Sequence, residues 1–445
     1  MDKIFYFVPI KIERLTHYLL FAAYLVLFSW LVTKIKFFNR SGFTNSQLVI
    51  IFLLKVMAGI FYGWIGVYYG QMAQMIDTWA YHVQGLEEYQ LLISHPVEFF
   101  TSLFHSSYEG GYTNFLVSQN SWWNDAKANF FIKLMAIFDL FSFGNYYVNV
   151  IFYSFLSLFG PMAIYKVMKD VFPSEKIPVL IASFLVPSFL YWTSGLHKEG
   201  LIFLGLALLI YHLYFGFKEK RFPVYRILLI LIGTGLVLIL RNFLILPLLP
   251  ALVAWILCQK LKFKPIFIYT IVFAVFLTLF FTVKYFIPGI DPPQSVVIKQ
   301  KEFIALEGHS SVAVNELEPT FTSFLINAPQ AFSLSLLRPY PSDVRHLLSL
   351  AAALEIAAIF LVFLVFLFWR KKGITLSPVL LFCLFFSAGV LFMIGYSVNN
   401  LGAIVRYRSI VFPLLLVPMA AKINWSRINE LLFQNIKNEN NTYIS

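Results

Sequence analysis

Charged residues are scarce in this chain: Asp, Glu, Lys and Arg make up 13% of its 445 residues. Globular proteins contain about 25%. Because 59% of the residues are hydrophobic as well, the composition excludes a soluble globular protein and predicts an all-α polytopic membrane protein. A net charge of +12 would suggest a nucleic-acid partner in a soluble chain. Here most of the excess lies in short connections between apolar runs, so no nucleic-acid partner is expected.

Cysteine is also scarce, and the only two, Cys258 and Cys383, lie in apolar segments. They indicate small buried side chains rather than a disulfide framework or a zinc site. His82, His95 and His105 lack the spacing of a strong metal motif, and neither HExxH nor CxxC occurs. The chain also lacks a Gly-rich phosphate loop, an internal repeat and a separate soluble domain. We therefore expect no tightly bound metal or cofactor, although a divalent cation held loosely at a phosphate is compatible with the chain.

Long apolar runs are what the chain has in abundance. A membrane span needs about 20 mostly apolar residues. The candidates are residues 15–35, 47–69, 145–167, 177–194, 200–217, 225–240, 243–259, 264–286, 348–369, 376–397 and 404–421. The two runs around Arg241 are short, but joining them would put an arginine in mid-bilayer at a cost of about 3 kcal/mol or more. The prediction is about 11 transmembrane helices in one domain over residues 1–421, followed by a cytoplasmic tail over residues 422–445.

The connections between these runs alternate between many and few basic residues. The basic ones hold Lys34, Lys36 and Arg40; Lys166, Lys169 and Lys176; Lys218, Lys220, Arg221 and Arg226; Lys260, Lys262 and Lys264; and Arg370, Lys371 and Lys372. The positive-inside rule assigns these ends to the cytoplasm of a bacterial-type cell. The N-terminus is then outside, although Lys3, Lys11 and Arg14 argue against an exported start, and the first span is expected to remain uncleaved. The unusual polar residues fall in the other connections, so an active site is expected on the periplasmic or external face of the cytoplasmic membrane.

Two of the outer connections are long, residues 70–129 and 288–347. In the first, apolar residues recur at helical spacing from Trp79 to Ile93, which predicts an amphipathic helix lying in the membrane interface. The stretch 130–143 is interrupted by charges and too short to span comfortably, so it predicts a second interfacial helix. In the second connection, Asp-Pro-Pro and Arg-Pro-Tyr-Pro favour ordered turns over a long helix.

Asp77 and His82 are the candidate catalytic residues, in the segment IDTWAYH that follows the second run. A carboxylate near the membrane surface can act as general base on an acceptor hydroxyl, because a lower dielectric raises its pKa toward a useful range. The alternative is that Asp77 caps the following helix, since Asp is a favoured N-cap residue. The two roles are compatible.

Candidate substrate- and phosphate-binding residues lie in two further outer segments. The turn SGLHKEG places His197, Lys198 and Glu199 between two apolar runs, where ionisable groups need polar partners. Lys198 can bind phosphate as a point charge, and Glu199 can hold it in place. The alternative is a solvated turn whose side chains reach the interface.

Guanidinium groups add to this set at Arg241, Arg406 and Arg408. They suit bidentate phosphate capture, and a helix N-terminus adds partial positive charge. The alternative is attachment to anionic headgroups.

Over about residues 47–421 the chain resembles the GT-C superfamily of integral-membrane glycosyltransferases. The likeness lies in the acidic Asp77 of the first long outer loop, the turn SGLHKEG, Arg241 before a Pro-containing helix, and Arg-Tyr-Arg at 406–408 before Pro413. It implies sugar transfer from a polyprenyl-phosphate carrier at the outer face, with Asp77 as general base. It also implies contacts of the lipid phosphate with Lys198, Arg241, Arg406 and Arg408. Asp125, Glu87, Glu88 and Glu109 lie in the same loop as Asp77 and are alternatives for the base.

Three functions stay open. The first is transfer of a sugar from a polyprenyl-phosphate-linked donor to a glycan, lipid or protein acceptor. The second is an O-antigen or polysaccharide polymerase or ligase that uses a polyprenyl-diphosphate-linked oligosaccharide. The third is a flippase or transporter of lipid-linked sugars, which needs charged groups near the bilayer midplane. The apolar runs contain few such groups, chiefly Lys55 and Glu355.

Overall fold

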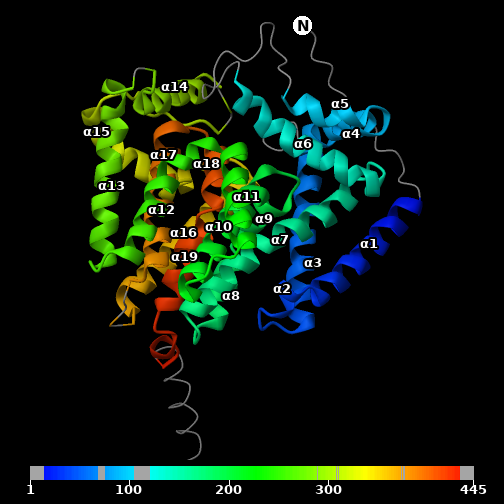
Figure 1. The fold of residues 1–445 in the computed structure, drawn as a ribbon, viewed down its shortest axis with the longest axis horizontal. Helices are drawn as coiled ribbons and strands as arrows, with labels where there is room; N and C mark the ends of the chain where they lie inside the picture. The colour runs from blue at the N-terminus through cyan, green and yellow to red at the C-terminus, as the bar shows by residue number, and fades with distance from the viewer. Residues whose placement is uncertain are drawn as a thin grey trace, which may run out of the picture. The chain divides into compact units, whose positions relative to one another are not determined.

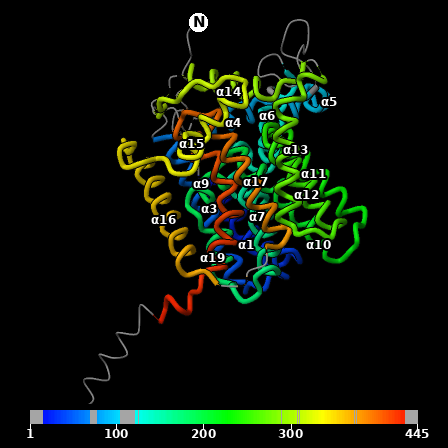
Figure 2. The backbone as a smooth tube through the Cα atoms, turned by 90° about the vertical axis from the view of Figure 1, so that its left-hand side faces the viewer, coloured from blue at the N-terminus to red at the C-terminus, as the bar shows by residue number. Residues whose placement is uncertain are grey.

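The computed structural model describes residues 15–68, 76–104, 121–287, 289–306, 308, 310–371, 373 and 376–430 (Figures 1 and 2). In these residues the regular structure is helical, and isolated β-bridges join Ser311 to Asn400 and Arg370 to Ile423. The predicted all-α class is therefore confirmed. Glu109 and most of the tail at 422–445 lie outside the described residues.

Helices form where the apolar runs predict them. Eight are long and apolar enough to cross a membrane: α1 (Leu15–Lys34), α3 (Asn45–Tyr68), α7 (Tyr146–Val171), α10 (Lys198–Glu219), α12 (Ile245–Lys260) with the 3₁₀ turn η3 (Asn242–Leu244), α13 (Pro265–Thr282) with η4 (Val283–Tyr285), α16 (Leu347–Trp369) and α17 (Pro378–Ser397). Two bent pairs raise the number to ten if each is one span, and α11 (Val224–Leu240) is a shorter apolar helix. The chain is thus a multi-pass membrane protein with eight to ten such spans in its described part, and the predicted number of eleven stays a prediction.

Prolines explain both bends. α8 (Lys176–Phe184) meets α9 (Pro187–Ser194) at 49°, and α18 (Leu401–Ser409) meets α19 (Phe412–Lys422) at 61°. Pro187 begins α9, and Pro413 lies in the first turn of α19. A proline removes one backbone donor and clashes with the preceding turn, so the chain restarts as a new helix in a new direction.

The chain divides into two compact units. Unit 1 comprises Met1–Tyr112, Ala128–Leu158 and Ser194–His197. It contains α1, α3 and the first half of α7, together with α2 (Lys36–Asn39), α4 (Ile76–Ser94), α5 (Pro96–Thr101), η2 (Ser102–Phe104) and most of α6 (Trp122–Ser142). The two expected interfacial segments are indeed helices, α4 and α6, and they are joined by an ion pair between Glu88 and Lys133 at 2.7 Å. Their position in the interface stays a prediction.

Unit 2 comprises Thr113–Lys127, Phe159–Thr193 and Lys198–Ser445. Within it α10 packs on α11, α12 on α17, and α19 on α8. The second long connection forms two short helices, α14 (Pro292–Ala305) and α15 (Phe321–Phe332), followed by the π-turn η5 (Ser333–Leu337) and the 3₁₀ turn η6 (Pro341–Asp343). Asp291 and Thr320 cap the two helices by accepting hydrogen bonds from Gln294 N and Ser323 N. The Asp-Pro-Pro segment, expected to favour turns, therefore starts a helix.

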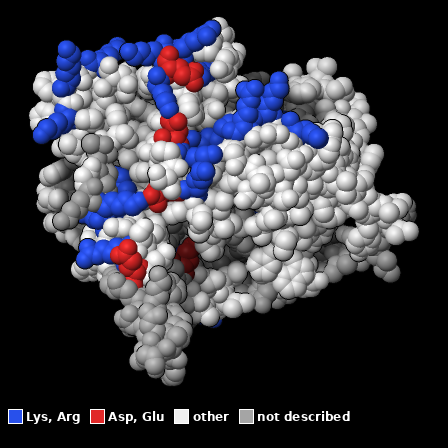
Figure 3. All heavy atoms as spheres, turned by 90° about the horizontal axis from the view of Figure 1, so that it is seen from below, with Lys and Arg blue, Asp and Glu red and all other residues white. Residues whose placement is uncertain are grey.

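Three of the basic connections of unit 2 meet at one end of its helices. Asp170 near the end of α7 pairs with Lys218 near the end of α10 at 2.6 Å. Lys371 pairs with Glu175, and its backbone N–H donates to the carbonyl of Lys422 at 2.9 Å. Figure 3 shows Lys and Arg side chains gathered on a face of the molecule seen from below. Three of the predicted basic connections thus lie together, and the side of the membrane on which they lie stays a prediction.

Candidate functional site

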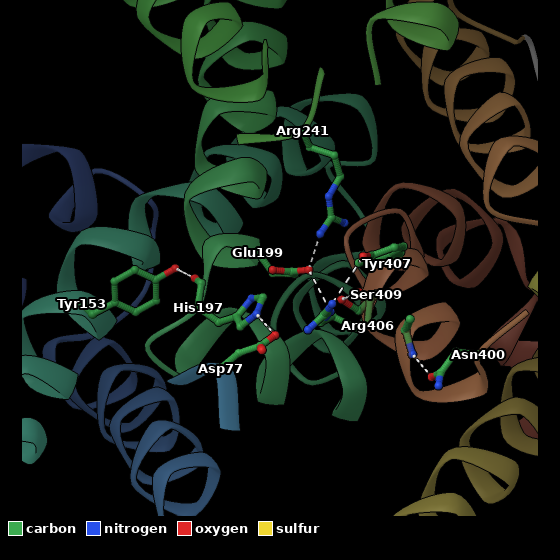
Figure 4. A network of polar contacts seen from close by, with 10 residues as sticks. Asp77, Tyr153, His197, Glu199, Arg241, Asn400, Arg406, Tyr407 and Ser409 are labelled. Atoms are coloured by element: carbon green, nitrogen blue, oxygen red, sulfur yellow. Dashed lines mark hydrogen bonds and ion pairs between the residues drawn. The ribbon is translucent and has the colours of Figure 1, made fainter. Parts of the chain in front are cut away.

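Asp77 lies in the first turn of α4 and faces His197 (Figure 4). Its Oδ2 is 3.5 Å from the imidazole Nε2. The Asp77 side chain is 46% exposed, whereas that of His197 is 3% exposed. A carboxylate at a helix N-terminus is favoured by the helix dipole, so the capping and catalytic interpretations of Asp77 remain compatible. This pair combines a reachable carboxylate with a histidine fixed in the protein.

The segment Ser194–His197 is held tightly by unit 1. The hydroxyl of Tyr153 donates a hydrogen bond to the carbonyl of His197. Lys55 Nζ donates to Ser194 Oγ at 3.2 Å. Gly59 of α3 lies so close that a Cβ atom there would be 2.6 Å from the carbonyl oxygen of Ser194. These contacts fix the backbone of the segment, and the backbone in turn positions the His197 imidazole.

Glu199 follows His197 by two residues and is the centre of a second polar cluster, within unit 2. Its buried carboxylate accepts a hydrogen bond from Arg241 Nη2 at 2.5 Å, and Arg406 Nε lies 3.6 Å from the same oxygen (Figure 4). The side chains of Glu199, Arg241 and Arg406 are 0%, 9% and 17% exposed. Two guanidinium groups thus share one carboxylate, and Arg241 Nη1 has no hydrogen-bond partner among the described residues. We call these three residues the arginine cluster.

Tyr407 lies against both arginines. Its ring centroid is 4.0 Å from the Arg241 guanidinium and 5.0 Å from that of Arg406, and Arg406 Nη2 donates to its hydroxyl at 3.3 Å. Cation–π contacts of this kind hold guanidinium planes in place. Sequence reasoning passed over Tyr407, although its position between Arg406 and Arg408 was a usable signal.

Lys127 belongs electrostatically to the same neighbourhood. Burial lowers the pKa of its ammonium group, the positive charges of Lys299 and Arg241 lower it further, and Tyr407 and Glu302 act in the opposite direction. The neighbourhood of the arginine cluster is therefore rich in positive charge, which suits an anionic group such as a phosphate.

The other predicted site residues lie elsewhere or take other roles. His82 is buried against Trp79 and Tyr146, and burial lowers the pKa of its imidazole to about 4. Arg408 is fully buried and donates to the backbone carbonyls of Ser335 and Arg338, so it ties α18 to the segment after α15. Lys198 is the first residue of α10 and is half-buried.

No group of three or more His, Cys, Asp or Glu side chains that could hold a metal ion occurs among the described residues. Cys258 and Cys383 are both free thiols.

The predicted site residues thus fall into two groups, Asp77 with His197 in unit 1 and the arginine cluster in unit 2. The chain passes from one unit to the other at the peptide bond between His197 and Lys198. A single pocket that contains both groups stays a prediction. Comparison of the chain with protein-family models, with curated proteins and with solved structures finds no match.

Proposed function

We propose that this protein is a membrane glycosyltransferase that moves a sugar from a polyprenyl-phosphate-linked donor to a glycan, lipid or protein acceptor. The observation that carries the proposal is the arginine cluster: two largely buried guanidinium groups share one carboxylate, and one buried nitrogen has no partner in the described chain. Buried charges need compensation, so a surplus of cations favours an anionic ligand. Glu199 lies at the opposite end of α10 from Lys218 and the basic connections, as a site on the non-cytoplasmic face requires.

In this proposal Asp77 removes the proton of the acceptor hydroxyl, and the resulting oxygen attacks the anomeric carbon of the donor sugar. The bond between that carbon and the phosphate oxygen breaks, and its electron pair leaves with the polyprenyl phosphate. Arg241 and Arg406 stabilise the charge that develops on the phosphate. His197 orients Asp77. The apolar carrier tail stays in the bilayer.

The test compares Asp77→Asn with Glu87→Gln, which removes an exposed carboxylate ten residues further along α4. Each variant is expressed in a deletion strain, and mass spectrometry then measures the lipid-linked and surface glycans. We expect Asp77→Asn to insert normally and leave the acceptor one sugar short, whereas Glu87→Gln restores the product. Normal glycans with Asp77→Asn contradict the role of Asp77, and loss of product with Glu87→Gln instead assigns the base to Glu87.

A polymerase or ligase of diphosphate-linked oligosaccharides is the second candidate. It is favoured by the two largely buried guanidinium groups at Glu199, because two cations suit the two phosphates of a diphosphate-linked donor. For such an enzyme we expect Asp77→Asn to remain active and Arg241→Gln to be inactive. The inactive variant should lose lengthening of the glycan chain rather than the addition of one sugar unit.

Transport finds less support in the charged residues of the spans. Lys55 hydrogen-bonds Ser194, and the Glu355 carboxylate accepts from the backbone N–H of Ser188 at 2.8 Å. Each therefore has a local structural partner. Substrate flux in proteoliposomes without any covalent product would nevertheless establish transport.

A further inference from the structure

Helices α14 and α15 of the second long connection share one small core. Val296 and Val297 of α14 cluster with Leu317 and with Phe324 of α15, and Phe280, Phe281, Met393 and Tyr396 from α13 and α17 pack against them. The glutamine side chain of Gln300 accepts a hydrogen bond from the backbone N–H of Leu317 at 2.9 Å. The two helices are thus fixed to each other and to the ends of two spans, as Figure 1 shows.

The outward faces of the two helices differ in chemistry. α15 exposes large apolar side chains, with Phe321 52%, Leu325 61% and Ile326 70% exposed. α14 exposes mainly polar side chains, among them Ser295, Lys299 and Lys301. Its exposed apolar residues are Ile298 at 40% and Ala305 in its last turn, next to the C-cap residue Leu306 at 70%. Exposed apolar side chains are favoured in an apolar environment, and exposed polar side chains are favoured in water. The difference therefore indicates apolar surroundings for α15 and aqueous surroundings for α14.

The apolar face of α15 continues the surface of a spanning helix. The ring of Phe281 at the end of α13 lies 5.4 Å from the rings of both Phe321 and Phe324. One turn earlier on α13, Leu277 is 52% exposed. Because α13 is a candidate span, its exposed leucines are expected to face lipid, and the exposed apolar side chains of α15 continue that surface. With 12 residues α15 is too short to cross the bilayer.

Both helices also connect to α18, which carries Arg406. Arg408 donates to the carbonyls of Ser335 and Arg338, directly after α15. α14 also contacts α18, because the ring of Phe303 in α14 lies 6.5 Å from the ring of Tyr407. The level of α14 and α15 in the membrane therefore determines the level of the arginine cluster.

We propose that α15 inserts its outward face into the bilayer interface while α14 lies in water, so that the membrane surface passes between them. The partner of the α15 face is membrane lipid. Because α14 and α15 contact α18, this position of the membrane surface brings the arginine cluster to the depth of the lipid headgroups. This inference stands on the membrane location of the chain and holds whatever group the site transfers.

Spin labels on the full-length protein in liposomes test the proposal. Cys258 and Cys383 are replaced by alanine, and single cysteines are introduced and labelled at positions 325 and 326 of α15 and, as controls, at 295 and 301 of α14. Power saturation compares collisions with oxygen, which concentrates in the bilayer, and with a water-soluble nickel chelate. We expect the α15 labels to collide mainly with oxygen and the α14 labels mainly with nickel. Nickel accessibility at 325 and 326 overturns the proposal, and so does protection from both reagents, which indicates a protein partner such as a second copy of the chain.

A matched pair of isoleucine substitutions gives a second readout in the protein with its native cysteines. Ile326→Asp places a charge on the α15 face, and Ile298→Asp places one on the α14 face. Charge near the bilayer is costly, whereas charge in water is not. We expect Ile326→Asp to lower the midpoint temperature of unfolding in liposomes and Ile298→Asp to leave it unchanged. Equal effects of the two substitutions contradict the proposal. Absence of sugar transfer by the wild-type protein, together with the expected labelling pattern, contradicts the proposed function alone.

Discussion

His197 supports Asp77 from the protein side: its Nε2 lies 3.5 Å from Oδ2 of a carboxylate whose side chain is 46% exposed, while the imidazole itself is 3% exposed. The rings of Tyr62 and Tyr81 lie edge-on to this imidazole at centroid distances of 6.4 Å and 5.9 Å. The histidine thus has little freedom to leave the carboxylate. We infer that His197 is a positioning residue that acts through Asp77.

The first prediction concerns His197→Gln and His197→Ala. A glutamine amide can still donate a hydrogen bond to the carboxylate, whereas an alanine methyl group cannot. We expect His197→Ala to lower the rate of transfer by roughly tenfold to hundredfold, the scale of a misplaced catalytic group. His197→Gln should keep more of the rate, because the amide can still hold the carboxylate. Wild-type turnover in His197→Ala, or equal losses in both variants, contradicts the positioning role of His197.

His82 provides the control for that experiment. Its imidazole is buried, and its lowered pKa of about 4 keeps it neutral from about pH 5 upward. His82→Gln is therefore expected to leave the shape of the pH–rate profile unchanged above about pH 5. A changed profile would assign to His82 the catalytic role that the sequence suggested.

The second prediction concerns the shared carboxylate of the arginine cluster. Glu199→Gln leaves Arg241 and Arg406 without their common counter-charge in a buried position. Removing one partner of a buried ion pair costs about 3–5 kcal/mol of unfolding free energy. In the double variant Glu199→Gln with Arg406→Gln, one of the two cations that shared the carboxylate is also removed, so part of that loss should be recovered. Unfolding in mixed detergent micelles measures the unfolding free energies of the single variants and of the double variant. If the losses of the two single variants simply add in the double variant, the shared pairing is contradicted.

Sequence patterns predicted the helices well because apolar runs and prolines act locally. The bends before α9 and α19 follow from Pro187 and Pro413. The partners of charged residues could not be predicted in the same way. The sequence suggested only the chain neighbour Lys198 as a partner of Glu199, and the structure adds two arginines far along the chain, Arg241 at 2.5 Å and Arg406 at 3.6 Å. Such contacts depend on how spans pack, which hydrophobic periodicity leaves undetermined.

The burial of individual arginines could not be predicted from the sequence either. Arg408 and Arg406 are two residues apart in an Arg-Tyr-Arg motif and received the same role. Arg408 is fully buried on backbone carbonyls, whereas Arg406 contacts Glu199. Successive helix positions differ by about 100° in direction, so two residues of the same type can meet unrelated surroundings.

The third prediction concerns Asp139 of α6 and pH. Burial raises the pKa of its carboxyl to about 6, against hydrogen bonds from Asn149 and Ser142, which lower it. The folded state therefore binds this proton more tightly than the unfolded state, whose pKa is about 3.9. The resulting stability, about 3 kcal/mol, is present below about pH 4 and is lost as pH rises through about 6.

Asp139→Asn keeps the oxygen that accepts from Asn149 at 2.7 Å and from Ser142 at 3.1 Å, but it removes the titrating group. We expect its unfolding temperature to vary less than that of the wild type between about pH 4 and pH 6. Ser142→Ala, which removes one hydrogen bond that favours the charged form, should move the same window to higher pH. If the unfolding temperature of Asp139→Asn varies with pH as steeply as that of the wild type, Asp139 is not the source of the pH dependence.

The fourth prediction concerns the close contact that holds the segment before His197. At Gly59 an added Cβ would lie 2.6 Å from both the carbonyl oxygen of Ser194 and a methyl group of Val150, whereas at Gly235 of α11 it would meet nothing within 4 Å. Gly59→Ala therefore overpacks unit 1 and should cost about 1–3 kcal/mol of unfolding free energy. Gly235→Ala should be neutral or stabilising by up to about 1 kcal/mol, because alanine has the higher helix propensity.

The same pair of variants tests whether the position of His197 matters for transfer. Since Ser194 and His197 belong to one short segment held by unit 1, displacing the Ser194 carbonyl shifts the imidazole relative to Asp77. We expect Gly59→Ala to lower kcat at temperatures where the variant is still folded, while Gly235→Ala keeps the wild-type value. If Gly59→Ala is destabilised yet turns over normally, the tight packing of this segment serves stability alone, and the positioning role must rest on His197 and its contact with Asp77.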